Sequence, residues 1–409
     1  MARLCGYLAL LLAGVAAGGG ALVTTRPPTH GLELLALVAS ERSLFPSAGA
    51  LLALAFVLGA LRVRAPGPPP AVVLASVVLA VAGLVLGVLP YAAARRVAAE
   101  KQLTLSIGRY LRARIDTEGP IRAERTITYA TTSDGRPLGM DVYMPAIPSP
   151  SPSPSSAAPR PRPPVLVLHG GGWNAGDKGD ASRFSRWLAS QGFVVLDVQY
   201  RTHPQPNWRQ AIGDVACAIV WVRRHAAEPA WNLDPGAITL LGRSAGGHLA
   251  LMAAYGTDDT RRAPSLLPPL LPEGCRGTDT SVAAVIAYYA PTDLVWGHEH
   301  PASPRVYDSN DRMRRFIGGD GDAYEALYRS LSPVNQVSRK SPRTLLIHGG
   351  RDQLVGAEHM FRLASVLARE AVPHETLFLP TARHAFDFMV GGFDEQLASA
   401  AVLRFLPPP

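Results

Sequence analysis

The chain has 409 residues, of which 47% are hydrophobic and only 18% charged, a composition that excludes an intrinsically disordered protein. Its three cysteines are too few for a disulfide framework and lack the spacing of a zinc site. The formal net charge is +8, but residues 1–120 hold 11 basic and 5 acidic side chains, which leaves 29 against 27 for the rest. Since the main part of the chain is nearly neutral, no clustered basic surface is expected there, and nucleic acid is excluded as a partner.

Three stretches near the N-terminus carry no charged residue over a length that crosses a bilayer: 5–23, 43–61 and 71–94. A helix rises about 1.5 Å per residue and needs roughly 20 apolar residues to cross ~30 Å of hydrocarbon. We therefore predict three transmembrane helices within a membrane region of residues 1–98, followed by a basic connector at 99–120. Residues 31–40 are apolar too, but this stretch is short and carries Glu33, so we expect a helix at the membrane surface.

The first stretch has an alternative interpretation as a cleaved signal peptide, because Arg3 precedes an apolar run that small residues follow. With three spans, three arginines lie on one side of the membrane: Arg3, Arg62 and Arg64. Five basic residues lie on the other side with the rest of the chain: Arg26, Arg42, Arg95, Arg96 and Lys101. The positive-inside rule, at five to three, predicts a multi-pass cell-membrane protein whose main domain is cytoplasmic.

From residue 121 to 409 the pattern changes to strands that alternate with helices. Short apolar runs bounded by Gly and Pro predict buried parallel strands at 165–168, 193–198, 238–241, 282–287, 344–347 and 376–379. Apolar residues at helical spacing predict a covering helix over 207–224, and 126–129 with 140–143 predict an early antiparallel pair. This order predicts one α/β domain built on a mainly parallel sheet, with a Pro/Ser-rich surface loop at 145–164.

A Gly-Arg-Ser-Ala-Gly sequence follows the predicted strand 238–241 and precedes a helical pattern. Small residues on both sides let the backbone turn sharply at Ser244, so that its hydroxyl is exposed as a nucleophile. Chance produces this five-residue pattern often, so the strand before it and the helix after it carry much of the weight.

A His-Gly-Gly-Gly-Trp sequence at 169–173 follows the predicted strand 165–168. Glycines leave backbone N–H groups free to bind a substrate oxyanion, together with the N–H of Ala245, which follows the serine. A phosphate-binding loop is the alternative, but no Walker or G-x-G-x-x-G pattern follows. His169 precedes the glycines, and we expect it to anchor the loop.

Asp352 and His384 follow the last two predicted strands. A serine becomes a nucleophile when an imidazole accepts its proton and a carboxylate orients that imidazole. The chain order Ser244, Asp352, His384 predicts this catalytic triad. Three other residues have weaker claims to a catalytic role: His348, Asp293 and Asp387.

Taken together, these motifs make residues 137–407 resemble the carboxylesterases of the α/β-hydrolase superfamily, close to the feruloyl-esterase-like and hormone-sensitive-lipase-like bacterial esterases. The resemblance implies hydrolysis of a carboxylic ester through an acyl-enzyme, with no cofactor and no metal. In this family the second and third glycines of the motif bind the oxyanion, which are Gly171 and Gly172 here. The membrane region, the loop at 145–164 and the Leu/Pro-rich segment within 261–276 depart from the family's common pattern.

The resulting prediction is a membrane-anchored serine esterase that acts on a small-molecule or lipid ester. An amidase, peptidase or formamidase would use the same site, and a catalytically inactive membrane-bound binding protein is the alternative from another class. The segment 266–271 is a candidate for contact with acyl chains. The sequence predicts neither the acyl and alcohol specificity nor the oligomeric state.

Overall fold

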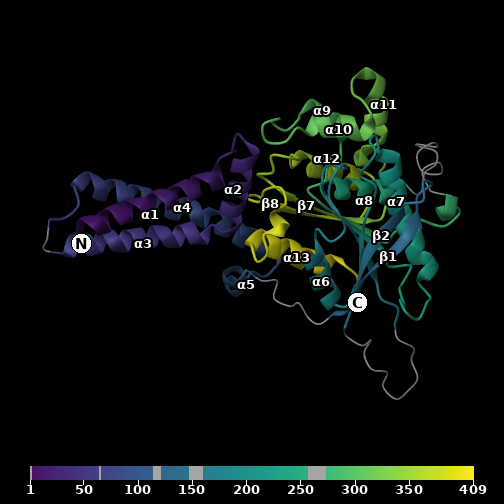
Figure 1. Ribbon diagram of the computed structural model, residues 1–409, viewed down its shortest axis with the longest axis horizontal. Helices are drawn as coiled ribbons and strands as arrows, with labels where there is room; N and C mark the ends of the chain where they lie inside the picture. Colours follow the sequence, from purple (N-terminus) through teal and green to yellow (C-terminus); the bar gives the residue numbers. More distant parts are fainter. Residues whose placement is uncertain (1, 64–65, 114–120, 147–159, 257–272) are drawn as a thin grey trace, which may run out of the picture.

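The computed structural model describes residues 2–63, 66–113, 121–146, 160–256 and 273–409. Most of the Pro/Ser-rich loop at 145–164 and the whole segment 266–271 lie outside these ranges. Figure 1 shows a bundle of long N-terminal helices that projects from one side of a sheet domain.

Three long helices form the bundle: α1 (Ala2–Thr24), α3 (Leu44–Arg62) and α4 (Pro70–Lys101). Each is long and apolar enough to cross a bilayer, which agrees with the predicted spans. Small residues face inward and let the helices approach closely; a Cβ at Gly83 of α4 would collide with the backbone of Ala16 and Ala17 in α1. Large apolar side chains face outward instead, and Leu11 and Leu58 are more than half exposed.

The helix expected at 31–40 is α2 (His30–Glu41), which lies where the bundle meets the sheet domain (Figure 1). It is not a fourth span. The predicted connector at 99–120 holds the end of α4 and the short helix α5 (Ile107–Arg112). Tyr110 of α5 is buried and stacks on Phe393 of the sheet domain, with ring centroids 4.4 Å apart. The predicted domain limits at 98 and 120 stay a prediction. Side chains on both sides of residue 98 pack against the sheet domain.

The sheet has eight strands in the order β1-β2-β4-β3-β5-β6-β7-β8. β1 and β2 form an antiparallel hairpin, β2 pairs antiparallel with β4, and all other neighbours are parallel. The strands are β1 (Ile121–Thr131), β2 (Pro137–Pro145), β3 (Pro164–Leu168), β4 (Val194–Val198), β5 (Thr239–Arg243), β6 (Ala284–Tyr288), β7 (Arg343–Gly349) and β8 (His374–Leu379). Every predicted strand is present, and the predicted α/β class is confirmed.

Helices cover both faces of this sheet. One face packs against α7 (Trp208–His225), α8 (Ala245–Tyr255) and α12 (Glu358–Arg369). The other packs against α6 (Ser182–Ser190) and α13 (Phe393–Phe405). Residues from α4 and α5 belong to this second core, so the N-terminal region and the sheet domain share one hydrophobic cluster.

Between β6 and β7 the chain forms α9 (Leu294–Glu299), α10 (Ser309–Ile317) and α11 (Asp322–Ser330). In Figure 1 these helices lie together at the top of the sheet domain. The three remaining short helices are η1 (Glu273–Cys275), η2 (Pro333–Asn335) and η3 (Phe386–Phe388). The loops that follow β3, β5, β7 and β8 all lie at the carboxyl ends of the parallel strands, as parallel pairing requires.

Candidate active site

Ser244 lies in a sharp turn between β5 and α8, with φ 53° and ψ −121°. An L residue adopts this region only under strain, which the surrounding packing maintains. Its N–H donates to the carbonyl of Tyr288 at 2.9 Å. The flanking glycines are required by space, because a Cβ at Gly246 would collide with the carbonyl oxygens of Leu168 and His169. The predicted strand–turn–helix around this serine is present.

His384 lies between Ser244 and Asp352. Its Nε2 is 3.1 Å from Ser244 Oγ, and its Nδ1 is 2.7 Å from Asp352 Oδ2. These three side chains are separated by up to 140 residues in sequence, and the loops after β5, β7 and β8 bring them together. Both distances lie within hydrogen-bonding range, so a proton can pass from the hydroxyl to the imidazole.

The carboxylate of Asp352 is fully buried and held from both sides. Its Oδ1 accepts hydrogen bonds from the backbone N–H groups of Leu354 and Val355, each at 2.9 Å. Burial alone would raise the pKa of Asp352, but the charge and hydrogen bond of His384 outweigh it and hold the pKa below its ordinary value. Asp352 is therefore ionised at neutral pH and accepts the Nδ1–H of His384.

The three glycines of 170–172 lie beside the serine. An added Cβ on Gly170 would lie 3.4 Å from the Cβ of Ser244. Gly171 and Gly172 have φ of 108° and 57°, a region that favours glycine, and Gly172 and Ala245 line the same cavity as Ser244. Gly171 lines the second cavity beside Ser244, so each of the three predicted oxyanion-binding residues borders a cavity that contains the serine.

Buried polar side chains anchor the glycine loop. The ring of His169 stacks on Tyr200 at 4.1 Å, and the Tyr200 hydroxyl donates to the carbonyl of His169 at 2.9 Å. Trp173 Nε1 donates to His248 Nδ1 at 3.2 Å, and the other nitrogen of His248 lies 2.8 Å from the carbonyl of Leu331. Burial lowers the pKa of His248 to about 4, so this histidine is neutral at pH 7. His169 occupies the anchoring position expected from the sequence.

Two cavities meet at Ser244. One, of about 370 Å³, extends under α9 and α10 and is lined by polar side chains and by apolar ones that include Trp296 and Met313. The other, of about 510 Å³, lies on the side of His384 and the glycine loop. Both volumes are in the range of small-molecule sites. Arg26, which follows α1, lines the first cavity, so the N-terminal region reaches the site.

The three rival residues have other partners. His348 is buried, and burial lowers its pKa; its Nε2 is 2.9 Å from the carbonyl of Val355 and 3.6 Å from Asp352 Oδ2. Asp293 caps α9 and accepts two hydrogen bonds from Arg362, at 2.7 and 2.9 Å. Asp387 pairs with the buried guanidinium of Arg243.

Several residues that support the site were missed in the sequence. Tyr289 lies against His384, with ring centroids 4.4 Å apart, and its hydroxyl donates to Asp387. Arg351 and Arg383, next to the predicted acid and base, bond to the N-terminal region. Only their position beside Asp352 and His384 was visible in the sequence. Among the described residues, no group of three or more His, Cys, Asp or Glu side chains is placed to hold a metal ion.

Comparison with known proteins places this geometry in a family. The BD-FAE family model matches residues 140–367. Two esterases of Mycobacterium tuberculosis are similar in sequence: LipC is 34% identical over 250 residues, and LipQ is 30% identical over 248 residues. These segments cover 59% of this chain and 57% and 55% of the two relatives, so the chain matches little more than half of each.

Solved structures share the fold. A thermophilic esterase of Thermogutta terrifontis, Est2 with bound butyrate, superposes with a TM-score of 0.53 at 23% identity, covering 70% of this chain and 97% of that one. An acetyl ester-xyloside bifunctional hydrolase of Caldicellulosiruptor lactoaceticus gives 0.52 at 21% identity, covering 71% and 100%. Because the family model matches more than half of the chain, the resemblance is confirmed, and the chain belongs to the BD-FAE family and has the α/β-hydrolase fold.

Proposed function

We propose that this protein is a membrane-anchored serine hydrolase that cleaves carboxylic esters through an acyl-enzyme. The observation that carries the proposal is the continuous hydrogen-bond path from Ser244 Oγ through His384 to Asp352, at 3.1 and 2.7 Å. The names of the relatives LipC and LipQ support an ester as the substrate class.

In this proposal Ser244 Oγ attacks the ester carbonyl while His384 Nε2 accepts the hydroxyl proton. The imidazolium keeps its Nδ1–H on the ionised Asp352, which stabilises the positive charge. The N–H groups of Gly171, Gly172 and Ala245 stabilise the tetrahedral oxyanion. The intermediate then collapses, and His384 gives its proton to the leaving alcohol. Water, activated by the same histidine, hydrolyses the acyl-enzyme and regenerates Ser244.

The two cavities beside Ser244 supply room for the two halves of an ester. The reacting carbonyl sits at their junction, so the acyl group occupies one cavity and the alcohol the other. Trp296 and Met313 give one wall of the first cavity aromatic and thioether side chains, which make favourable contacts with hydrocarbon, so this wall suits an apolar group.

Three apolar helices with outward-facing leucines support a multi-pass anchor in the cell membrane. At about 1.5 Å per residue, the 23 residues of α1 span roughly 34 Å, enough for the hydrocarbon layer. The connection after α1 lines the cavity through Arg26, which supports a lipid ester or another membrane-associated ester as substrate.

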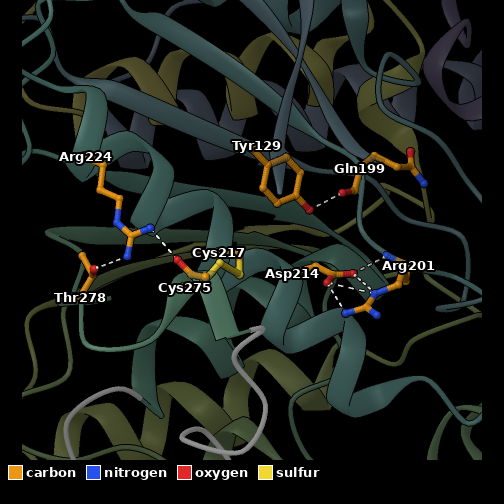
Figure 2. The surroundings of a disulfide bond; sticks show 9 residues. Tyr129, Gln199, Arg201, Asp214, Cys217, Arg224, Cys275 and Thr278 are labelled. Carbon is orange, nitrogen blue, oxygen red and sulfur yellow. Dashed lines mark hydrogen bonds and ion pairs between the residues drawn. A yellow bond between two sulfur atoms is a disulfide. The ribbon is translucent and has the colours of Figure 1, made fainter. Parts of the chain in front are cut away.

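The disulfide between Cys217 of α7 and Cys275 of η1 bears on which side of the membrane holds the hydrolase domain. Figure 2 shows this bond beside Arg224, which donates to Thr278 at 3.0 Å. Disulfides persist outside the cytoplasm and are rare within it. The bond therefore supports an extracytoplasmic domain, against the cytoplasmic side that the charge distribution predicts.

The predicted cytoplasmic side depends on five basic residues, of which Arg42 has partners within the protein. Arg42 donates to the carbonyl of Val390 at 2.6 Å and lies over the ring of Tyr110, and Arg26 lines the cavity. Without Arg42, the count becomes four basic residues against three, a bias of one, and the disulfide supports the opposite side. Alkaline phosphatase is active only after export, so a C-terminal fusion to it should be active if the hydrolase domain lies outside the cytoplasm. An inactive phosphatase fusion, with a fluorescent C-terminal fusion to a fluorescent protein, would place the domain in the cytoplasm instead.

The experiment that tests the function is labelling with a fluorophosphonate, followed by a panel of p-nitrophenyl esters of rising chain length. Covalent labelling that Ser244→Ala abolishes supports a serine hydrolase, whereas an unlabelled wild-type chain supports the inactive binding protein. Matched amide substrates distinguish an amidase or peptidase, because the same site serves any acyl transfer.

A further inference from the structure

The residues next to the proposed catalytic acid and base bind the N-terminal region. Arg351 and Gln353 flank Asp352, and Arg383 precedes His384 in the chain. Arg351 donates to the carbonyl of Thr24, and Gln353 donates to Glu33 Oε2 at 2.6 Å. The two catalytic loops are thus attached to the connection between α1 and α2.

The strongest of these contacts is an ion pair between Arg383 and Glu33. Arg383 Nη1 lies 2.6 Å from Glu33 Oε2, and the two side chains are 1% and 5% exposed. Arg383 Nη2 also donates to the carbonyls of Leu22 and Thr25, both at 2.8 Å. Removing one partner of a buried ion pair leaves an uncompensated buried charge, which is strongly destabilising. The position of Arg383 therefore depends on Glu33.

The two catalytic loops also hold each other. The N–H of Arg351 donates to the carbonyl of Ala382 at 3.0 Å, and the N–H of Gly350 donates to Leu379 at 2.8 Å. A Cβ at Gly349 would collide with the carbonyl of Ala382, so the loops touch at backbone distance. A displacement of Arg383 therefore moves both loops, and with them the 2.7 Å contact between His384 and Asp352.

We propose that Glu33 is a positioning residue for Asp352 and His384, and that the segment from Thr24 to Glu33 is part of the catalytic unit. This inference depends on the proposed serine-hydrolase function. Glu33 touches no substrate; it acts through Arg383 and Gln353. The N-terminal region then has a second role beside anchoring, since the geometry of the site depends on it.

Glu33 also contributes charge to the site. The titratable and charged groups around the pair of catalytic loops come from five parts of the chain: Arg351, Asp352 and His348 from β7 and its loop, Arg383, His384 and Asp387 after β8, Tyr289 after β6, Glu358 and His359 of α12, and Glu33 of α2. Replacing Glu33 by Gln removes a negative charge and leaves that of Arg383 unopposed. Protonation of His384 then becomes less favourable, so the acidic limb of the pH profile should move to lower pH.

The test compares Glu33→Gln with wild-type full-length protein in detergent. We expect kcat on a short p-nitrophenyl ester to fall by roughly 10- to 100-fold, because small misplacements of catalytic groups cost rates of this order. KM should change less, and the acidic limb of kcat/KM should shift downward. Glu33→Asp keeps the charge but not the reach, so it should restore the pH profile while kcat stays low.

Glu41→Gln is the matched control. Glu41 belongs to the same helix, is buried and lies against Gly392 and Asp394, away from the catalytic loops. Burial and the neighbouring Asp394 hold the pKa of Glu41 well above its ordinary value, which favours the uncharged acid, and Gln is a close replacement for that form. This variant should keep the wild-type kcat and pH profile.

Several results would overturn the inference. A Glu33→Gln variant with wild-type kcat and pH profile removes it, as does an equal loss in Glu41→Gln, which would indicate general destabilisation. If Glu33→Gln does not accumulate as folded protein, Glu33→Asp and Gln353→Ala are measured instead, and wild-type behaviour in both is equally decisive. A wild-type chain that does not react with fluorophosphonate overturns the proposed serine-hydrolase function and the inference that depends on it. A wild-type chain that reacts, together with unchanged Glu33 variants, overturns the inference about Glu33 alone.

Discussion

The Asp352→Asn variant tests the proposed triad sharply, because the structure fixes how the new amide must lie. Asp352 Oδ1 accepts two backbone N–H groups, from Leu354 and Val355, both at 2.9 Å. The amide oxygen of Asn must take this position, since an NH₂ group there would face two donors. The NH₂ group then faces His384 Nδ1 in place of Oδ2, at 2.7 Å in the wild type.

This arrangement forces the wrong tautomer on the histidine. Facing a donor, Nδ1 must accept, so the proton moves to Nε2, which faces Ser244 Oγ at 3.1 Å. A protonated Nε2 cannot accept the hydroxyl proton. The expected loss in kcat is roughly 10⁴-fold, or about 5 kcal/mol of transition-state stabilisation, the size of the effect that a wrong tautomer has in a Ser-His-Asp site.

The assay is steady-state hydrolysis of a short p-nitrophenyl ester by the full-length protein. KM should change little, and the thermal unfolding midpoint serves as a check on folding. Asp293→Asn is the matched control, because Asp293 is buried near the site but pairs with Arg362. An Asp352→Asn variant that keeps kcat within tenfold of the wild type would refute the reasoning, and a large loss in Asp293→Asn would identify the orienting carboxylate instead.

Four further predictions follow from the same geometry. Ser244→Ala should abolish fluorophosphonate labelling and leave circular dichroism unchanged; retained labelling would contradict the assignment. The Cys217→Ser/Cys275→Ser variant, which opens a loop of 58 residues, should lose about 4 kcal/mol of unfolding free energy by chain entropy, measured by urea unfolding; an unchanged midpoint would show that the bond adds nothing. Because burial lowers the pKa of His248 to about 4, the unfolded chain binds its proton first, and stability should fall between pH 6.5 and 4 by on the order of 3 kcal/mol; stability that stays flat over that range in urea unfolding would contradict this. Removal of residues 1–120 should give an aggregating or inactive domain, because Arg383 loses Glu33; a soluble truncated domain with wild-type kcat would show that the region only anchors.

The site residues that could be predicted are those that short, local sequence patterns mark. Each candidate residue directly follows an apolar run that forms a strand, and parallel strands bring their carboxyl ends to one edge. The glycines around Ser244 are also local, since they are required by contacts within one turn and the neighbouring strand. Order along the chain was therefore enough to predict which three side chains meet.

The disulfide could not be predicted in the same way. Three cysteines allow three different pairs, and neither a spacing nor a local motif marks Cys217 and Cys275 as partners. The pair forms because α7 and η1 are adjacent in the folded domain, with Cα atoms 5.4 Å apart. The prediction of the side of the membrane therefore depends on charge alone, and the basic residues that it counts include Arg42, which donates to Val390 within the protein.

For Glu33 the sequence predicts part of the contact but not its partner. Its charge predicts that residues 31–40 do not cross the membrane, which agrees with the short helix α2. A lone carboxylate in an apolar stretch carries a second implication: burying it without a partner costs several kcal/mol, so a cation must lie nearby. The sequence offers 40 candidates, and none is marked by spacing, because the partner is 350 residues away. Only the fold selects Arg383, and because Arg383 precedes the proposed catalytic base, the same contact that satisfies a buried charge also ties the membrane region to the site.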